Sequence, residues 1–300
     1  MQIPRPAASI VIPSRDRPDK LARCLSALQE QETEVLFEIL VVDDGSVPPV
    51  ALPDVSHPTI LSVVAIRRDG TGPARARNAG IERARGELIL FTDDDTIPGP
   101  HWIETAVSFL TSHPDHVGVE GPTITPAYDP LYFHSVRASA PGSFLTCNVA
   151  YRREAIEEVG GFSEMFPSAH AEDLDLGFRI ARLGPTGYES RMVVLHPPMP
   201  TTLLGEIRRG RQLVSDGYLF RRHPERYPWS RFLSPAGYAL FLNAKHWGYC
   251  LLRDYYRVGN SPRRAVRFVV LAAGYSAVGA VAVVQDALRR ARRRRASLQP

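Results

Sequence analysis

The stretch GELILFTDDDT, residues 86–96, places a short apolar run directly before three adjacent aspartates. The run from Leu88 to Phe91 is too short for a helix and apolar enough for a buried strand. Three adjacent carboxylates repel one another, so they fit best at the C-terminal tip of a strand, where open α/β sheets bind ligands. Carboxylates there could hold a divalent cation, and the cation could hold phosphates. An isolated run of acids more often forms a solvated turn, so the rest of the chain has to decide.

Apolar runs of the same kind recur along the first half of the chain. Each is followed by polar or acidic residues and then by a helical pattern, and the runs cover 9–13, 37–42, 60–66 and 88–91. Helices are expected from Pro18, after Gly72 and over 102–110. This alternation predicts a doubly wound, mostly parallel α/β sheet. The tips of the first, second and fourth strands would lie on one edge, where a nucleotide is expected.

The second half of the chain is less regular. A short helix is expected from Arg152 to Gly160, and strands are expected over 117–120, 144–151 and 191–195. A further helix is expected to place Leu174, Phe178 and Leu183 on one face. From residue 201 the pattern is helical, with an interruption over 223–230. We therefore expect a C-terminal helical extension after the α/β sheet.

The composition, 44% hydrophobic and 23% charged, is ordinary for a globular protein. The net charge of +4 is unevenly spread, because residues 260–300 hold nine arginines and one aspartate and leave the remainder mildly acidic. This asymmetry indicates an anionic partner for the tail alone. Three cysteines without CxxC spacing favour a reducing compartment. The N-terminus, MQIPRPAAS, lacks the apolar run of a signal peptide, so a cytoplasmic location is expected.

Two common nucleotide-binding motifs are absent. Gly70-Thr71-Gly72 begins a GxGxxG pattern, but Arg75 stands where the third glycine belongs, and the motif should follow the first strand. No GxxxxGK[ST] occurs either. These absences argue against a Rossmann dehydrogenase and against a P-loop NTPase, and the glycines instead permit a tight turn.

Two other polar segments each allow a structural and a functional interpretation. Asp43-Asp44-Gly45-Ser46 is a good turn sequence, yet a carboxylate at the end of an apolar strand could accept a base N–H or a ribose hydroxyl. Arg75 and Arg77 could be ordinary exposed helix arginines, or one of them could bind a diphosphate at the strand tips.

Seven short motifs follow one another along the chain: SIVIPS at 9–14, VVDDGS at 41–46, GPARARNAG at 72–80, FTDDD at 91–95, CNVAYRR at 147–153, GGFSE at 160–164 and EDLDLG at 172–177. In this order they resemble the family 2 glycosyltransferases, over residues 8 to about 198. The resemblance implies a GT-A fold, a nucleoside-diphosphate-sugar donor, a divalent ion (Mn²⁺ or Mg²⁺) and inversion at the anomeric carbon. We expect a GT-A catalytic domain over 1–225 and a helical, membrane-associating extension over 226–300.

The resemblance also assigns donor-binding residues. Asp44 matches the aspartate that binds the base, and Pro13 and Arg15 match residues that line the nucleotide. Arg77 matches the arginine of the family's Ala-Arg-Asn stretch, on the donor side. Asp93, the first acid of the family's DxD motif, is expected to meet the donor and its metal ion.

The remaining assignments concern the metal ion and the proton. Asp95, the second outer acid of the DxD motif, and His196 match metal ligands of the family, and Asp173 matches the catalytic base. The chemistry agrees, because a departing nucleoside diphosphate needs a Lewis acid and an acceptor hydroxyl needs a carboxylate within reach. The bland alternatives are a helix cap for Asp173 and a structural role for His196.

Two positions depart from the family pattern, and one motif of a related group is absent. Asp94 makes the motif DDD, which leaves the middle acid without an assigned role. Cys147 replaces the small residue that often precedes Asn148, which could alter the acceptor pocket. No QxxRW motif of processive polymer synthases follows Gln212, so we expect transfer of a single sugar to each acceptor.

The tail contains an uncharged run over 268–284 with arginines on both sides. The run is at the short limit for a bilayer span, and basic residues at both ends oppose a span. A helix on the inner face of the cell membrane, with arginines on anionic lipid headgroups, fits better. The alternative is a buried core helix with a basic tail. Nucleic acid is not expected, because aromatic residues are not interleaved with the arginines.

The sequence therefore predicts a metal-dependent, inverting glycosyltransferase that is peripheral to the inner face of the membrane. Its acceptor would be a lipid-linked or envelope glycan. A sugar nucleotidyltransferase is the first alternative, although the glycine-rich loop that it needs after the first strand is absent. A non-catalytic nucleotide-sugar-binding or scaffold protein is the second.

Overall fold

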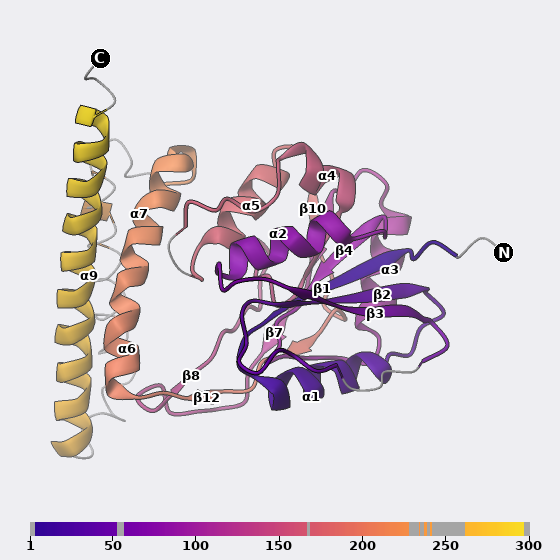
Figure 1. Ribbon diagram of the computed structural model, residues 1–300, viewed down its shortest axis with the longest axis horizontal. Coiled ribbons are helices and arrows are strands. Elements are labelled where there is room, and N and C mark those ends of the chain that lie inside the picture. Colours follow the sequence, from indigo (N-terminus) through magenta and orange to yellow (C-terminus); the bar gives the residue numbers. More distant parts are fainter. Residues whose placement is uncertain are drawn as a thin grey trace. The chain divides into compact units, whose positions relative to one another are not determined.

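The computed structural model describes residues 4–52, 57–166, 169–227, 234, 237–238, 241 and 262–296, with side chains to 290 in the last segment. The chain forms two compact units, which we call the sheet unit and the helical unit (Figure 1). The sheet unit comprises Met1–Ala127, Ser135–Glu164 and Glu172–Pro198, and the helical unit comprises Tyr128–His134, Met165–Ala171 and Met199–Pro300. The domain boundary expected near residue 225 stays a prediction.

A seven-stranded sheet forms the centre of the sheet unit, in the order β10-β6-β9-β4-β1-β2-β3. All neighbouring strands are parallel except β9, which runs against both β4 and β6. The strands are β1 (Ala8–Ser14), β2 (Phe37–Asp43), β3 (Ile60–Arg67), β4 (Leu88–Phe91), β6 (Gly118–Glu120), β9 (Val149–Arg152) and β10 (Thr186–Tyr188). The predicted mostly parallel α/β sheet is confirmed.

Helices cover both faces of this sheet, as the alternating pattern predicted. One apolar core lies under α1 (Pro18–Gln29) and α3 (Trp102–Ser112). A second core on the other face contains residues of α2 (Pro73–Arg83), α4 (Arg153–Glu158) and α5 (Glu172–Ile180). The run Leu88–Phe91 is buried throughout, because a central strand between two helical layers has no exposed face.

Two predicted strands are shorter than expected. The strand predicted over 144–151 begins only at Val149, because Phe144 has a φ of +48° and turns the chain. The amides of Gly142, Ser143 and Phe144 donate to the buried carboxylate of Glu120, which holds this turn. The strand predicted over 191–195 is reduced to β11 (Val194–Leu195), because the preceding residues form a turn in which the Met192 amide donates to the Glu189 carbonyl.

The predicted face of α5 is also corrected. The helix ends at Ile180, so Leu183 lies beyond it and is exposed, while Leu174 and Phe178 are half-buried. The sequence Gly184-Pro185 follows, and a proline opposes helix in the residue before it. The buried side of the helix includes two acids and consists of Glu172, Asp175, Leu176, Gly177 and Ile180.

A small three-stranded sheet joins three segments of the chain, of which the last is far from the other two in the sequence. Its order is β5 (Ile97–Pro98), β11 and β7 (Thr123–Ile124). In the antiparallel pair, Leu195 lies opposite Ile97. The residue that follows β11, His196, is thereby placed close to the aspartates that precede β5.

The described residues of the helical unit contain a short strand pair and several helical segments. Strand β8 (Phe133–His134) pairs with β12 (Met199–Pro200), and the helical segments are α6 (Leu203–Arg209), η1 (Gly210–Gln212), α7 (Leu213–Arg222) and α9 (Pro262–Ala296). A 3-10 turn, η2 (Pro224–Arg226), follows α7. Helix α9 packs on α6, η1 and α7, and a Cβ added at Gly210 would lie 2.1 Å from the Tyr275 carbonyl oxygen. The aromatic segment around residues 232–256 lies almost wholly outside the described residues.

Candidate active site

The tips of β1, β2 and β4 lie side by side at one edge of the sheet (Figure 1). These strands are parallel neighbours, so their carboxyl ends point the same way. The three tips carry Ser14, Asp43-Asp44 and Thr92-Asp93, which confirms that the motifs of the first half of the chain converge. This edge is where open α/β sheets bind ligands.

A tight turn over residues 92–96, which we call the aspartate turn, separates the three carboxylates. The Thr96 amide and hydroxyl both donate to the Asp93 carbonyl, at 3.2 and 2.7 Å. The Thr96 hydroxyl also lies 2.7 Å from that of Thr92, which donates to the Cys147 carbonyl at 3.1 Å. Cys147 is buried beneath this turn. The turn separates Asp93, which pairs with Arg77, from Asp94 and Asp95, which share Arg17.

Asp94, the middle acid, points into the protein. Its Oδ2 accepts from the Ser14 hydroxyl at 2.8 Å, and its Oδ1 accepts from Arg17 Nη1 at 3.1 Å. Burial raises the pKa of the Asp94 carboxyl to about 6, although Arg17 opposes the rise. Asp94 therefore fastens the aspartate turn to β1, a role that sequence patterns did not reveal.

Asp95 faces a histidine. His196 Nε2 lies 3.7 Å from Asp95 Oδ1, and both side chains are only 6% exposed. His196 Nδ1 lies 3.1 Å from the Ser135 hydroxyl, which also donates to the His196 carbonyl at 3.0 Å. The second Asp95 oxygen accepts from Arg17 Nη1 at 3.0 Å. Ser135 thus fixes the ring with Nε2 toward the carboxylate, and no sequence motif marked it.

The donor atoms at Asp95 and His196 fit a divalent ion that is completed by other ligands. One carboxylate and one imidazole suit such an ion, and small divalent ions are often bound by one or two protein groups plus substrate phosphates and water. Within the described residues, no three His, Cys, Asp or Glu side chains form a metal-binding cluster. Asp93, which was also predicted to bind the metal ion, pairs with an arginine, and its metal role stays a prediction.

That arginine is Arg77 of α2, which is buried. Its Nη2 donates to Asp93 Oδ1 at 2.8 Å and its Nη1 donates to Glu172 Oε1 at 3.0 Å. The alternative of an ordinary exposed helix arginine is therefore wrong for Arg77. Arg75, in contrast, is exposed as that alternative expects, and it makes a half-exposed ion pair with Glu164. The predicted donor contact of Arg77 stays a prediction.

Asp173, the predicted base, is the second residue of α5 and is half-buried. Ala171 has a φ of +70°, so the chain enters the helix through a left-handed residue. Asp173 Oδ1 accepts from the Leu174 amide at 2.8 Å. The neighbouring Glu172 is buried and pairs with Arg77 through Oε1, which leaves Asp173 as the more accessible of the two acids.

The predicted base-binding aspartate, Asp44, holds a loop. Its two carboxylate oxygens accept from the Thr71 amide at 2.7 Å and from the Gly72 amide at 2.9 Å. The exposed Arg15 side chain lies against this loop, because a Cβ added at Gly70 would be 3.1 Å from Arg15 Nη1. Pro13 pairs with Val42 in the sheet and is half-buried. The structure brings Asp44 and Arg15 to the same loop, and their donor-binding roles stay predictions.

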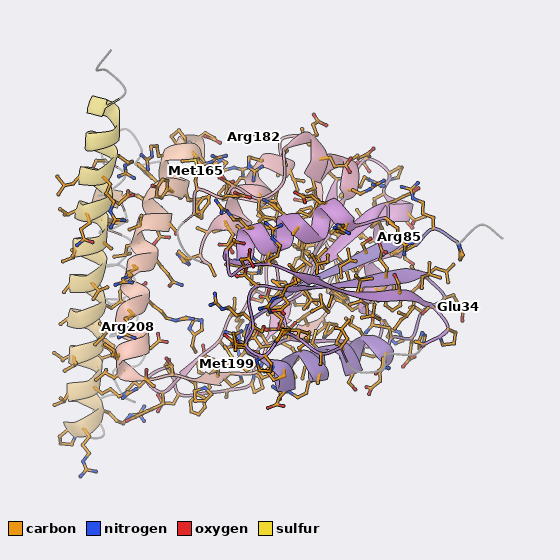
Figure 2. The ribbon with its side chains drawn as sticks, viewed as in Figure 1. Glu34, Arg85, Met165, Arg182, Met199 and Arg208 are labelled. Carbon is orange, nitrogen blue, oxygen red and sulfur yellow. The ribbon has the colours of Figure 1, made fainter. Side chains whose placement is uncertain are left out.

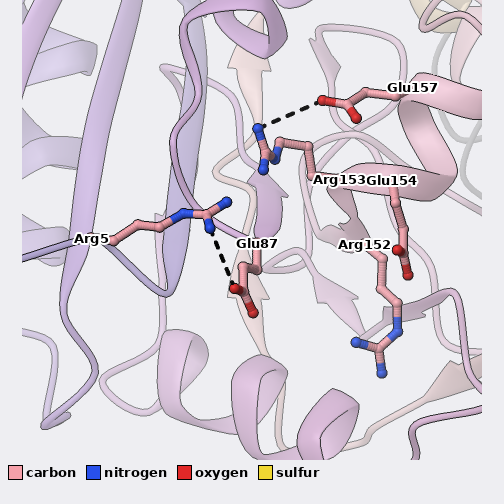
Figure 3. Close-up of a pocket in the computed structure, with 6 residues that line it drawn as sticks. All are labelled: Arg5, Glu87, Arg152, Arg153, Glu154 and Glu157. Carbon is pink, nitrogen blue, oxygen red and sulfur yellow. Dashed lines mark ion pairs between the residues drawn. The ribbon is translucent and has the colours of Figure 1, made fainter.

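A charged pocket of about 330 Å³ lies at the opposite edge of the sheet (Figure 3). Its arginines are paired: Arg5 with Glu87 and Arg153 with Glu157, each at 3.7 Å, while Arg152 donates to the carbonyls of Leu110 and His116. Nearby, Arg85, which is labelled in Figure 2, pairs with the buried Glu38. None of the site residues predicted from the sequence lines this pocket, whereas several of them lie at the strand tips.

The fold and its strand-tip edge define a GT-A α/β domain, and solved structures agree. A mannosyltransferase of Pyrobaculum calidifontis, solved with GDP-Man and Mn²⁺, has a TM-score of 0.59 at 20% identity, covering 94% of this chain and 88% of that chain. TarS of S. aureus, residues 1–349 with UDP, has a TM-score of 0.50 at 16% identity, covering 91% of this chain and 90% of that one. At such identities the likeness shows the fold.

Sequence comparison identifies the family. The model of glycosyl transferase family 2 matches residues 9–163, and that of glycosyl transferase family group 2 matches 88–293. The chain belongs to glycosyl transferase family 2.

Individual relatives are more distant. The pre-mycofactocin glycosyltransferase of Mycobacterium tuberculosis is 29% identical over 209 residues, which are 63% of this chain and 42% of that protein. Glycosyltransferase AglE of Haloferax volcanii is 30% identical over 171 residues, 52% of this chain and 56% of that protein. The chain thus spans less than two thirds of the length of these relatives.

Proposed function

We propose that this protein transfers one sugar from a nucleoside-diphosphate-sugar donor to a hydroxyl acceptor, with inversion at the anomeric carbon. The observation that carries the proposal is the pairing of Asp95 with His196 beside Asp93 at the strand-tip edge. The structures with GDP-Man and Mn²⁺ and with UDP support a nucleotide donor for this fold. The absence of a QxxRW motif after Gln212 favours a single transfer.

On the donor side, each group has a separate task. Asp44 would accept a bond from the base, with Pro13 and Arg15 beside the nucleotide, and Asp93 would meet the ribose and diphosphate. Asp95 and His196 would hold Mn²⁺ or Mg²⁺. When bound, the ion supplies positive charge to the diphosphate as it leaves. Arg17 would then share Asp95 with the ion, since it already donates to that carboxylate.

On the acceptor side, Asp173 would take the proton of the attacking hydroxyl. An alcohol is a weak nucleophile at neutral pH and needs a base within hydrogen-bond distance. A single direct displacement inverts the anomeric carbon, so one carboxylate on the acceptor side suffices. Asp173 is half-buried at the start of α5, whereas Glu172 and Asp175 are buried in ion pairs with arginines. Asp173 is therefore the member of the acidic trio best placed to reach a substrate.

We also infer that the helical unit binds the inner surface of the cell membrane. Among the described residues, the segment Pro262–Arg290 is the one helix long and apolar enough to cross a membrane. Its packing in the helical unit argues against a span, because α9 contacts α6 and α7. These two helices carry charged residues, among them the exposed Arg208 (Figure 2), and charges are costly in the bilayer centre.

The side of α9 away from its described neighbours is mostly apolar, although Gln285 is also exposed there. A row of its exposed apolar residues recurs every three or four positions and forms what we call the outer stripe: Val266, Val270, Ala273, Ala277, Val281, Val284 and Leu288. Exposed Arg263 and Arg289 flank the stripe at its two ends. A helix with this pattern suits the interface of an anionic bilayer, lying in its plane. This location favours a lipid-linked or envelope glycan as acceptor.

A donor screen tests the proposed activity. Purified protein is incubated with Mn²⁺, a panel of nucleoside-diphosphate sugars and lipid-linked acceptors, and release of the nucleoside diphosphate is measured. We expect one donor to give release that depends on the acceptor and on the metal ion, with product of inverted configuration by NMR. Release from no donor, or release unaffected by chelation, would overturn the proposal.

A further inference from the structure

We propose that Arg77 is a positioning residue that ties the aspartate turn to the start of α5 and so sets Asp93 and Asp173 at a fixed separation. The proposal rests on the proposed function, in which Asp93 faces the donor and Asp173 faces the acceptor. It differs from the donor contact that the family resemblance implies, because both terminal nitrogens of Arg77 donate to protein carboxylates.

The bridge joins three segments that are distant in the sequence. Arg77 is on α2, Asp93 follows β4, and Glu172 is the first residue of α5. The Arg77 and Glu172 side chains are each 5% exposed, whereas the Asp93 side chain is 28% exposed. The α5 end of the bridge is thus fixed in the interior, and the Asp93 end reaches the strand-tip edge.

Arginine is the residue type that this bridge needs. Its planar guanidinium presents several N–H groups in a fixed fork, so one side chain can hold two carboxylates at a set angle, which a lysine ammonium cannot do. Burial lowers the pKa of Arg77, but the charges of Asp93 and Glu172 raise it by more. The pKa is therefore raised overall, and the guanidinium stays charged.

The surroundings of Arg77 hold the bridge in place. Its guanidinium carbon lies 5.7 Å from the centre of the Phe162 ring. The next residue on α2, Asn78, accepts from the Phe162 amide at 2.8 Å and donates to the Phe162 carbonyl at 3.0 Å. The Ala-Arg-Asn stretch thus fixes the segment that follows α4 with one residue and the start of α5 with the other.

The bridge is not built for stability alone. Among the described residues, Arg77 Nε and Glu172 Oε2 are buried without a hydrogen-bond partner. Buried unpaired groups are rare in native proteins and call for an explanation, of which a functional constraint is one. Because Asp173 directly follows Glu172, any change in the ion pair moves the carboxylate that would take the proton. A misplacement of about 1 Å can slow catalysis by about a hundredfold.

Glu172→Gln is the sharpest test, because it keeps size and shape and leaves the pair between Arg77 and Asp93 intact. We expect kcat to fall at least about tenfold, while the Kd for UDP or GDP, whichever base the donor screen selects, changes less than about threefold. The matched control is Glu164→Gln, which alters the half-exposed ion pair between Glu164 and Arg75. Arg75 lies on α2, as Arg77 does, and this variant should keep wild-type kcat. Wild-type kcat in Glu172→Gln, or equal losses in kcat and nucleotide binding, would overturn the proposal.

A second measurement needs neither donor nor metal ion. Arg77→Lys, Glu172→Gln and the double variant are unfolded with urea, and their midpoints are compared. A direct bridge predicts that the double variant loses clearly less than the sum of the two single losses. Additive losses would mean that the two residues do not act together. If the wild-type protein transfers no sugar, the proposed function fails, and this cycle still decides whether the bridge exists.

Discussion

The Ser14 hydroxyl donates to Asp94 Oδ2 at 2.8 Å and so joins the tips of β1 and β4. The two residues are 80 positions apart in the sequence. Asp94 is 3% exposed and also accepts from Arg17, the residue directly before α1. The middle acid of the DDD run is therefore a structural residue. It holds the turn from which its two neighbours reach the strand-tip edge.

We predict that Asp94→Ala lowers the free energy of unfolding by about 2 kcal/mol, because Ser14 and Arg17 both lose a charged hydrogen-bond acceptor. Ser14→Ala, which removes a single bond, should lower it less, by about 1 kcal/mol. Urea unfolding followed by circular dichroism measures both. Asp69→Ala, at an exposed position, is the control. If Asp94→Ala is as stable as the control, the assigned role is wrong.

Sequence patterns predicted the sheet and the convergence of the strand tips well, because buried strands and the turns after them are local features. They could not show which way each aspartate of the turn points. That direction depends on the Thr92 and Thr96 hydroxyls and on partners far away in the sequence. Ser135 was missed for the same reason, since only the fold places it beside His196.

The failures in α5 have a comparable origin. Helical periodicity wrongly placed Leu183 on a buried face of α5. It also could not predict that the first buried residue of α5 is an acid, Glu172. Glu172 is buried because Arg77 neutralises it, and a buried ion pair between distant elements leaves no trace in a local hydrophobic pattern. Tertiary pairing of charge, not local propensity, decides that position.

We predict that Asp95→Ala and His196→Ala each abolish the rise in melting temperature that Mn²⁺ and the donor nucleotide produce together. Each variant removes one of the two protein groups that would hold the ion. Ser135→Ala should retain a smaller rise, because the ring keeps its donor atom and loses only its orientation, which typically costs about 10- to 100-fold in metal affinity. Differential scanning fluorimetry with and without Mn²⁺ measures all three.

The control for the metal prediction is Asp115→Ala, an exposed acid of the sheet unit that is remote in sequence from the strand tips. It should show the wild-type rise. A wild-type rise in both Asp95→Ala and His196→Ala would contradict the metal assignment. Asp93→Ala should also abolish the rise, through the loss of its contact with the donor and its bound ion.

We predict that Asp173→Asn binds the donor with wild-type affinity and transfers sugar about 10² to 10⁴ times more slowly. Asparagine keeps the shape of the side chain but cannot accept the acceptor's proton. Calorimetry with the nucleoside diphosphate and a transfer assay separate the two effects. Undiminished transfer would remove Asp173 from its proposed role, and a matched loss of donor binding would assign it to the donor side.

We predict that the protonation of Asp43 lowers the free energy of unfolding of the protein in acid. Although burial raises its pKa, hydrogen bonds from Ser46, Val50 and Arg67 lower the pKa to about 2. A lowered pKa stabilises the fold above the ordinary value near 4 and loses this contribution as the pH falls toward 2. The contribution is at most about 2 kcal/mol, because Arg67 is half-exposed and water screens its charge. Urea unfolding between pH 5 and pH 2 should show a shallower decline for Asp43→Asn than for wild type or for Asp69→Asn, and parallel curves would contradict the prediction.

We predict that the outer stripe of α9 governs membrane binding. A glutamate at Val281 or Val284, which are 55% and 57% exposed, should weaken binding to phosphatidylglycerol-containing vesicles at least about tenfold, because each places a charge within the apolar interface. Replacing Arg263 and Arg289 by glutamine should weaken it by about 1 kcal/mol per residue and reduce its salt dependence. Val64→Glu, an exposed position on β3 of the sheet unit, is the control. Vesicle co-sedimentation measures the binding. If Val281→Glu still binds as well as wild type, the outer stripe does not bind the membrane and has another partner. If the protein binds only to neutral vesicles, the arginines have no role in membrane binding.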